Sequence, residues 1–351
     1  MVVMSKQDNS SIALQNSLNG KKILFIGVDF YDYEVVIREA LEKRGAIVCY
    51  CSSKVSTLKS RLAKRLGSTF ESGVKDKIRY RRLSNATKNN DVVFVIKGAE
   101  LNRRDLNLIK ESNPNAVFKL YLWDSLSNHN NISLLFEHFS DIWSFDRLDC
   151  LANPKLKFRP TFYRGRVADK VNITANSAET LAANSIDKKY AVTFVGRIYG
   201  ERFEVAKRLR DQLEECNREY FIKFFMELPD YIIARYIKRS LSKKDSELIT
   251  TKKVPFNLYN EAVRNSSVLL DIGHVKHSGL TMRIFDALAA RCYIVTNNSD
   301  IKNYSDIPSS LYTIYNKDIN LNELLLLGTD HLSSLNLDNY SLDSFINELF
   351  S

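Results

Sequence analysis

Short, nearly continuous apolar runs alternate along the chain with longer segments in which apolar residues recur every three or four positions. The continuous runs predict buried β-strands, and the periodic segments predict amphipathic helices. Strands are predicted at residues 22–28, 46–51, 91–97, 116–123, 141–145, 190–195, 221–226, 267–272, 293–296 and 311–315. Helices are predicted at residues 33–43, 55–66, 103–110, 132–139, 202–216, 256–264, 280–290 and 322–327. Because apolar strands alternate with helices, we expect an α/β fold built on parallel sheets.

The order of predicted elements repeats once along the chain. A length of 351 residues exceeds the usual size of one hydrophobic core, so two domains are expected. We predict a disordered tail at 1–20, a Rossmann-like domain at 21–163, a polar linker at 164–188, a second Rossmann-like domain at 189–335 and a C-terminal helix at 336–351. Two doubly wound domains that face each other across a cleft form the GT-B arrangement.

Several protein classes are not indicated by the sequence. No run approaches the ~18 apolar residues of a membrane span, and the first residues lack the basic start and apolar core of a signal peptide. The five cysteines include no CxxC pair, which argues against a zinc site or a disulfide framework. We therefore expect a cytoplasmic protein.

The positive charge is concentrated in one segment. Between Lys54 and Lys88 there are eleven Lys or Arg and two acidic residues, and the helix predicted at 55–66 is amphipathic. Such a helix either packs its apolar stripe inward or rests on an anionic membrane surface, and both interpretations stay open. The segment lacks interleaved aromatic residues, so no nucleic-acid partner is predicted.

One strand–turn–helix segment indicates a phosphate site. A small-residue turn from Ser278 to Thr281 follows the strand at 267–272 and leads into the helix at 280–290. Free N–H groups at a helix start bind phosphate, and Arg283 and Asp286 are suited to a phosphate and to ribose hydroxyls. The alternative is an ordinary βαβ crossover.

Four segments also resemble a known family. They are LYLWDSLSN (120–128), FDRLDCLANPKLKFRPTFY (145–163), VTFVGRIYGERFEVAKRL (192–209) and SGLTMRIFDALAARCYIVTNN (278–298). In this order they are similar to bacterial lipopolysaccharide and capsule glycosyltransferases, GT-B proteins related to the CgeB-like group. The resemblance implies transfer of a sugar from a nucleotide-diphosphate sugar to a surface polysaccharide or a lipid-linked glycan.

The resemblance also implies that the donor binds the C-terminal domain. Donor-binding candidates are Gly196, Arg197, Arg202, His277, Ser278, Gly279, Leu280, Thr281, Arg283 and Asp286. Asp286 stands where many GT-B enzymes carry a Glu that binds ribose, and its side chain is one methylene shorter. Ser278 stands where the paired-glutamate form of the motif has its first acid, so inversion is favoured over retention.

No metal or other cofactor is predicted. His274 and His277 lack a third ligand and helical spacing, so they do not indicate zinc. No DxD pair occurs where a GT-A metal site needs one, and His277 more plausibly contacts the donor.

Inversion requires a general base near the acceptor hydroxyl. Asp29 and Asp124 follow predicted strands of the first domain, at the sheet edge where ligands bind. Each has an alternative role as a cap, and Glu34 or Asp146 are further candidates for the base. Trp123 either stacks on the acceptor sugar or fills a domain face.

Two other functions stay open. One is a sugar-nucleotide epimerase or phosphorylase on the same scaffold. The other is a non-catalytic, membrane-associated subunit of glycan assembly, which the absent acid and the short Asp286 leave possible.

Overall fold

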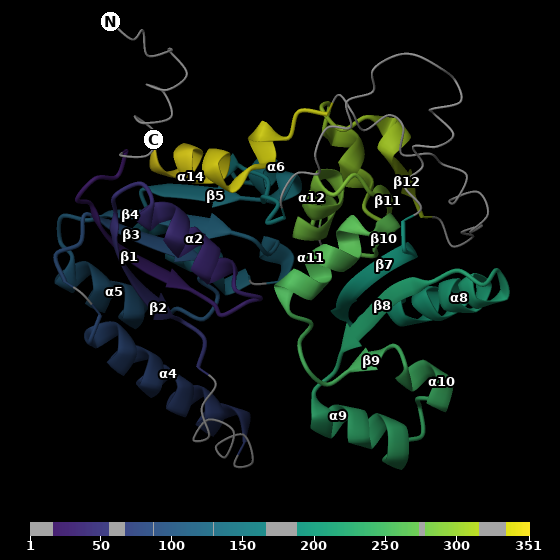
Figure 1. The fold of residues 1–351 in the computed structure, drawn as a ribbon. Coiled ribbons are helices and arrows are strands. Elements are labelled where there is room, and N and C mark those ends of the chain that lie inside the picture. Colours follow the sequence, from purple (N-terminus) through teal and green to yellow (C-terminus); the bar gives the residue numbers. More distant parts are fainter. Residues whose placement is uncertain are drawn as a thin grey trace, which may run out of the picture. The chain divides into compact units, whose positions relative to one another are not determined.

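A computed structural model describes residues 17–55, 67–86, 88–128, 130–165, 188–273, 278–315 and 335–351. These residues form two compact units, one comprising the chain up to Pro160 together with Leu342–Ser351, the other comprising Thr161–Ser341. Figure 1 shows the elements of each unit. No helix among the described ranges is long and apolar enough to cross a membrane.

The first unit is built on a six-stranded parallel sheet of order β2-β1-β3-β4-β5-β6. The strands are β1 (Lys22–Gly27), β2 (Ile47–Ser52), β3 (Val92–Ile96), β4 (Val117–Leu122), β5 (Asp141–Ser144) and β6 (Leu156–Phe158). Its helices are α2 (Tyr33–Glu42), α4 (Ser68–Ser84), α5 (Arg103–Ser112), α6 (Arg147–Ala152) and α14 (Leu342–Phe350). The predicted parallel sheet is confirmed.

The second unit repeats this plan with the strand order β12-β11-β10-β7-β8-β9, again parallel throughout. Its strands are β7 (Tyr190–Arg197), β8 (Tyr220–Phe225), β9 (Ile249–Thr250), β10 (Ser266–Asp271), β11 (Tyr293–Thr296) and β12 (Tyr312–Ile314). Its helices are α8 (Arg202–Glu215), α9 (Leu228–Ile232), α10 (Lys243–Ser246), α11 (Phe256–Arg264) and α12 (Met282–Ala289).

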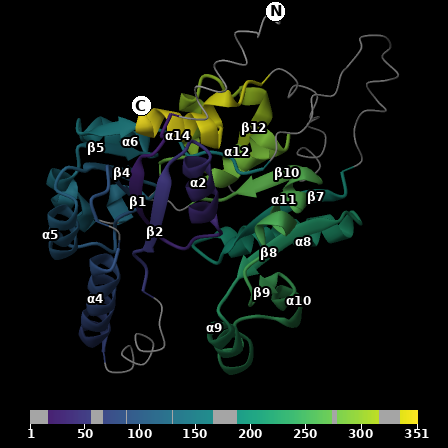
Figure 2. The ribbon, with the colours of Figure 1, turned by 60° about the vertical axis from the view of Figure 1, so that its left-hand side comes forward.

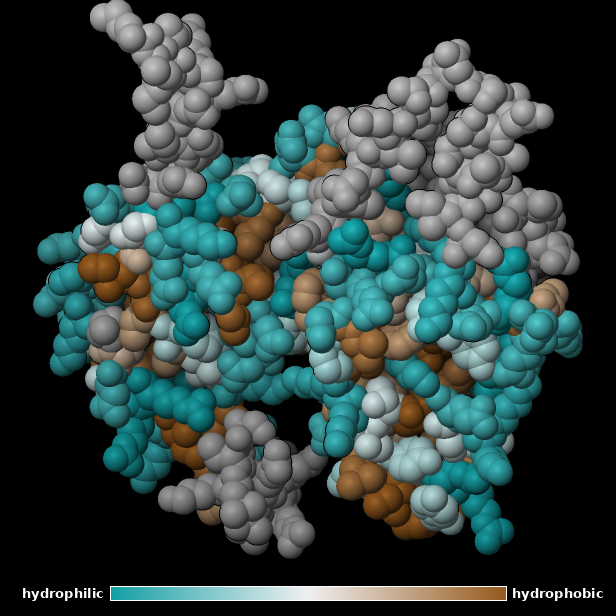
Figure 3. Space-filling view, viewed as in Figure 1, coloured by the Kyte–Doolittle hydropathy of each residue, from teal (hydrophilic) through white to brown (hydrophobic). Residues whose placement is uncertain are grey.

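Short helical turns complete both units. Residues Asn130–His138 form a 3-10 helix, where an amphipathic α-helix was predicted at 132–139. A π-helical turn, η3 (Ile233–Ile237), continues directly from α9. Large apolar side chains stay exposed over α9 and η3, and brown atoms gather there in Figure 3.

The C-terminal helix α14 belongs to the first unit. It lies beside α2 in both ribbon views (Figures 1 and 2). Phe345 packs edge-on against Tyr121 of β4, with ring centroids 4.7 Å apart, and Phe350 packs against Phe94 of β3 at 5.2 Å. Asp343 forms a 2.7 Å ion pair with the buried Arg44, which follows α2.

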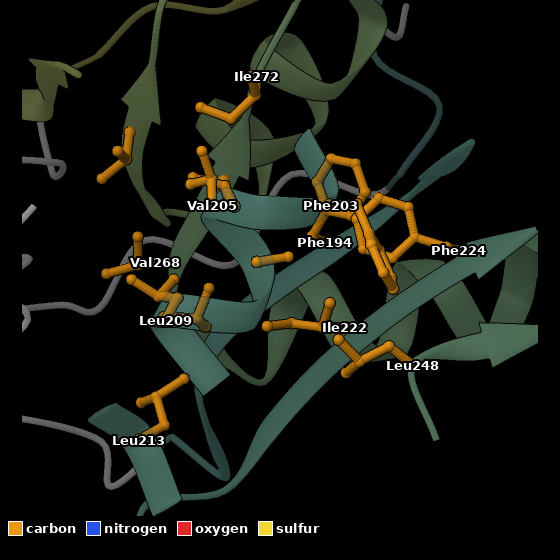
Figure 4. Packing of buried hydrophobic residues seen from close by; sticks show 14 of the residues in the cluster. Phe194, Phe203, Val205, Leu209, Leu213, Ile222, Phe224, Leu248, Val268 and Ile272 are labelled. Atoms are coloured by element: carbon orange, nitrogen blue, oxygen red, sulfur yellow. The ribbon is translucent and has the colours of Figure 1, made fainter. Parts of the chain in front are cut away.

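One hydrophobic core cluster of the second unit lies between its sheet and α8. Phe203 of α8 contacts Phe224 of β8 edge-on at 5.2 Å, and Phe224 contacts Phe194 of β7 at 4.8 Å (Figure 4). Leu209 and Leu213 extend the same apolar face of α8. This packing fixes the first residue of α8 against the ends of β7 and β10.

Parts of the predicted elements lie outside the described residues. They are most of the helix predicted at 55–66, the helix at 322–327, most of the linker at 164–188 and residues 1–16 of the predicted tail. Residues 17–20, which were included in the predicted tail, form a turn. In this turn Leu18 is buried, and its amide donates to the carbonyl of Arg44 at 3.0 Å.

Candidate functional site

The centre of the candidate site is Asp271, the last residue of β10. Its side chain is fully buried at the carboxyl end of the second sheet. Its Oδ1 accepts from the Thr281 hydroxyl at 2.8 Å and from Nε of Arg283 at 2.8 Å, and Nη2 of Arg283 lies 2.6 Å from the same oxygen. A buried carboxylate requires such partners, because an unpaired charge is costly in an apolar interior. Asp271 thus fixes both Thr281 and Arg283 at the start of α12.

Arg202, the first residue of α8, adds a second guanidinium group. Its Nε donates to the carbonyl of Ile272, the residue after β10. Burial, and then the positive charge of Arg283, lower the pKa of Arg202 to about 10. The negative charge of Asp271 acts on this pKa in the opposite direction. Two guanidinium groups near the same strand end are suited to an anionic ligand.

Both neighbouring helices begin without a side-chain cap in the described part of the chain. Thr281 occupies the position before α12, but its hydroxyl donates to Asp271 and does not accept from the helix. Glu201 occupies the position before α8 and makes no capping bond. Uncapped first-turn amides and the helix dipole both favour a bound anion.

The predicted turn before α12 is held by two asparagines that follow β11. Nδ2 of Asn298 donates to the carbonyls of Ser278 at 3.1 Å and Gly279 at 3.0 Å. In a trans peptide the C=O and N–H groups point in opposite directions, so the amides of Gly279 and Leu280 face away from Asn298. Asn297 accepts from the Gly273 amide at 2.7 Å. These bonds hold Gly273 on one side and Ser278 on the other side of residues 274–277, and the predicted site residue His277 lies outside the described residues.

Gly196 and Arg197 end β7, as predicted. A Cβ atom on Gly196 would lie 2.8 Å from the Phe194 ring, so packing alone requires glycine here. Arg197 is exposed, and its guanidinium lies 5.0 Å from the centroid of the Phe225 ring. The structure therefore brings Arg202, Thr281 and Arg283 together around Asp271, while Arg197 lies against β8.

Asp286 has partners of its own. Its Oδ1 accepts from the Arg164 amide at 2.9 Å and its Oδ2 accepts from the Tyr259 hydroxyl at 3.2 Å. The carboxylate therefore joins the segment that opens the second unit to α11 and α12. A ribose contact would have to share or displace one of these bonds, so the ribose role of Asp286 stays a prediction.

The pH dependence of stability is expected to report on Asp286. Burial raises the pKa of Asp286 to about 6, against the opposing effect of its two donors. Between about pH 4 and 6 the folded chain then holds a proton that the unfolded chain has lost, so this group makes the unfolding free energy fall as pH rises. Above that window its contribution is constant. The side chain of Asp286→Asn cannot titrate. As pH rises from about 4 to 6, the unfolding free energy of this variant should therefore increase by up to about 3 kcal/mol relative to that of the wild type.

Urea unfolding of both proteins at several pH values measures this difference. The control is Asp306→Asn, which changes an acceptor of Tyr340 at 2.6 Å in the same unit. A pH-independent difference between Asp286→Asn and the wild type would contradict the assignment.

In the first unit, Asp29 follows β1 and is exposed. Its carboxylate accepts from the Tyr50 hydroxyl at 2.9 Å and from the Ser52 hydroxyl at 3.0 Å, both on β2. Burial, and then Asp29, raise the pKa of Tyr50 above its usual range, so the phenol stays a hydrogen-bond donor. The alternative role of Asp29 as a cap of α2 is wrong, because Asp32 occupies that position.

Aromatic residues gather beside Asp29. Phe30 is 44 % exposed, and its ring centroid lies 5.8 Å from that of Trp123 and 6.2 Å from that of Tyr33. Asp124, next to Trp123, forms a 2.7 Å ion pair with Lys97, the residue after β3. Carboxylates and an exposed aromatic ring therefore lie at the carboxyl end of the first sheet.

The two further base candidates have structural roles. Asp146 is buried, caps α6 by accepting from the amides of Leu148 and Asp149, and also accepts from the Ser125 hydroxyl. Glu34 accepts from the Phe30 amide at 3.2 Å. Asp271 was missed by the sequence analysis, although an acid that ends an otherwise apolar strand was a usable signal.

Solved structures of other proteins share the fold of this chain. No protein-family model matches the chain, and no curated protein sequence matches it. The chain is similar to the catalytic domain of starch synthase IV from Arabidopsis thaliana bound to ADP and acarbose, at 8 % identity and a TM-score of 0.52 over 95 % of this chain and 99 % of that one.

Two further solved structures are similar. A glycosyltransferase from Rickettsia africae ESF-5 has 12 % identity and a TM-score of 0.49, over 95 % of this chain and 98 % of that one. HepE from Anabaena, in complex with UDP and glucose, has 11 % identity and a TM-score of 0.46, over 94 % and 96 %. The predicted fold class is confirmed: the chain has two Rossmann-like units and the GT-B fold.

Proposed function

We propose that the protein is a glycosyltransferase that moves a sugar from a nucleotide-diphosphate sugar to a glycan or lipid-linked acceptor. The observation that carries this proposal is the placement of two guanidinium groups, those of Arg202 and Arg283, near the end of β10 and beside two helix starts that have no side-chain cap. A pyrophosphate is negatively charged and accepts hydrogen bonds from amides and guanidinium groups. The shared fold with a starch synthase domain bound to ADP supports the same class of ligand by analogy.

The same groups would promote departure of the nucleoside diphosphate. Negative charge grows on the pyrophosphate as its bond to the anomeric carbon breaks, and fixed positive groups stabilise that charge more than the ground state. In this scheme Arg202 makes the closer contact, because Arg283 is already bonded to Asp271. The arginines and amides take the role that a metal ion has in other transferases.

Asp29 is the favoured base for the acceptor. It is exposed, whereas Asp124 is paired with Lys97 and Asp146 is buried in a cap. The acceptor hydroxyl gives its proton to Asp29, its oxygen bonds to the anomeric carbon, and the nucleoside diphosphate leaves with the electron pair of the broken bond. One such displacement inverts the anomeric configuration. Phe30 and Trp123 offer aromatic surface on which a sugar ring stacks.

The proposed class of acceptor is inferred from the four segments that resemble lipopolysaccharide and capsule glycosyltransferases. They support a role in extending a surface polysaccharide or a lipid-linked glycan on the inner face of the cell membrane. Membrane contact through the stretch from Lys54 to Lys88 also stays a proposal, because most of the amphipathic helix predicted there lies outside the described residues. In the described part of that stretch, Arg79 of α4 is buried and paired with Asp105 at 2.7 Å.

Arg202→Gln is expected to weaken nucleotide binding by about 1.5–3 kcal/mol, the range for a hydrogen bond to a charged group. A thermal-shift screen with UDP, GDP, CDP and dTDP first identifies the nucleotide, because a ligand that binds the folded state raises the melting temperature. Calorimetry then compares the variants. Arg208→Gln is the matched control, since Arg208 lies on the same helix and bonds to Tyr315 at 2.9 Å.

Release of nucleoside diphosphate from the corresponding nucleotide sugar, with transfer of the sugar, tests the reaction. If no nucleotide shifts the melting temperature, or if both variants bind like the wild type, the proposed donor site is wrong. Conversion of the donor alone into another nucleotide sugar would indicate an epimerase.

A further inference from the structure

The helical stretch formed by α9 and η3 in the second unit has an apolar outer face. Leu228, Ile232, Ile233, Tyr236 and Ile237 are 54 %, 44 %, 39 %, 65 % and 71 % exposed. We call these five residues the apolar patch. The opposite face carries Tyr231 and Ala234, which pack against the core of the unit. The stretch thus buries one apolar face and leaves a second one uncovered.

This arrangement is unusual for a surface helix, whose outer face is normally polar. Single exposed apolar residues are common, but contiguous ones mark a surface that another apolar phase covers. Brown atoms gather over α9 in Figure 3. η3 ends at Ile237, Arg239 has a positive φ of 50°, and the Ser240 amide donates back to the carbonyl of Ala234 at 2.9 Å. The patch is therefore presented by a fixed helix end.

Basic residues adjoin the apolar patch. The segment 228–244, which includes the patch, contains Arg235, Lys238, Arg239, Lys243 and Lys244 and one acidic residue, Asp230. Lys244 is committed to Asp211 at 2.7 Å and Glu214 at 2.8 Å. Lys238, Arg239 and Lys243 are exposed and form no ion pair within the described ranges. We call these three residues the basic strip.

We propose that the apolar patch and the basic strip dock the protein on an anionic lipid bilayer. Apolar side chains of an amphipathic helix enter the boundary between headgroups and acyl chains, and adjacent Lys and Arg are attracted to anionic headgroups. A protein partner would need both an apolar surface and clustered acids, whereas an anionic bilayer offers the two together. This proposal is argued only from the apolar patch and the basic strip, and it does not depend on the proposed glycosyltransferase activity.

The position of the apolar patch in the second unit is relevant to the binding of a lipid-linked acceptor. α9 follows the carboxyl end of β8, and β8 is parallel to β7 and adjacent to it. The patch therefore begins at the same sheet edge as Arg202 and the other groups of the candidate donor site. Docking through this edge would bring that site toward the lipid surface, where a lipid-linked acceptor is held.

Vesicle flotation of the full chain tests the proposal. The wild type is expected to float with vesicles of phosphatidylcholine and phosphatidylglycerol and to bind weakly to phosphatidylcholine alone. Lys238→Ser/Arg239→Ser/Lys243→Ser should lower the partition coefficient about fivefold for each basic residue removed. Ile232→Ser/Ile237→Ser should lower binding to both kinds of vesicle. The matched control is Leu148→Ser/Leu151→Ser on α6, which removes two side chains that are 60 % and 76 % exposed.

A tryptophan at the patch reports on insertion. In Tyr236→Trp, brominated acyl chains should quench the added fluorescence when anionic vesicles are present, beyond any change in Trp123 and Trp143 of the wild type. Far-UV circular dichroism checks that each variant is folded. Equal flotation of wild type, basic-strip and apolar-patch variants would overturn the proposal. A wild-type dimer in sedimentation that Ile232→Ser/Ile237→Ser converts to a monomer would instead assign the patch to a second copy.

Discussion

Asp271→Ala is expected to lower the free energy of unfolding by about 3–5 kcal/mol, the cost of breaking a buried ion pair by removing one partner. The Arg283 guanidinium, 19 % exposed, would lose its carboxylate partner Asp271. The Thr281 hydroxyl would lose its acceptor as well. Denaturant unfolding followed by circular dichroism measures the loss.

A double-mutant cycle measures the interaction energy between Asp271 and Arg283 separately from their contacts with the rest of the site. Asp271→Ala/Arg283→Met removes both charges and should recover part of the lost stability, because no buried charge is left uncompensated. Glu137→Ala serves as control, since it breaks the exposed pair of Arg103 and Glu137 and should cost less than about 1 kcal/mol. Additive effects of Asp271→Ala and Arg283→Met would show that the two residues do not act as a pair.

Asp29→Asn is expected to lower kcat by about 10²–10⁴-fold, the usual contribution of a general base, with the dissociation constant of the nucleotide unchanged. Asparagine keeps an acceptor for Tyr50 and Ser52 but cannot take a proton at neutral pH. The rate of nucleoside diphosphate release from the nucleotide sugar identified by thermal shift measures the effect.

Asp32→Asn is the matched control for the base. Asp32 is exposed and has a positive φ of 60°, a conformation that asparagine adopts readily, so this variant should retain its activity. Asp124→Asn removes the partner of Lys97 and should have a smaller effect than Asp29→Asn. If Asp124→Asn lowers kcat more than Asp29→Asn does, the general base is Asp124, which follows β4.

The strands were predictable because they are apolar runs in sheets that are buried on both faces. The bounds of β11 (Tyr293–Thr296) and α11 (Phe256–Arg264) agree with the predicted ranges. α4 was missed because its only buried residues are Arg79 and Leu83, so it shows no apolar stripe. The edge strands β6 and β9 have three and two residues, too few to show a pattern.

Only those residues of the candidate site that lie at strand ends or helix starts could be predicted from the sequence. Arg202 and Arg283 stand out in the sequence because each lies in the first turn of a helix that follows a strand. Asp271, the ion-pair partner of Arg283, did not stand out, since an ion pair is a contact between segments that are distant along the chain. For the same reason the bond between Asp286 and the Arg164 amide, and those of Asp29 with Tyr50 and Ser52, could not be predicted.

The return of α14 to the first unit has a consequence for biosynthesis. Phe345 and Phe350 reach Tyr121 and Phe94 only after all of Thr161–Ser341 has been translated. Until then the growing polypeptide carries an unfinished first core with exposed aromatic rings, a state that is prone to aggregation and attracts chaperones.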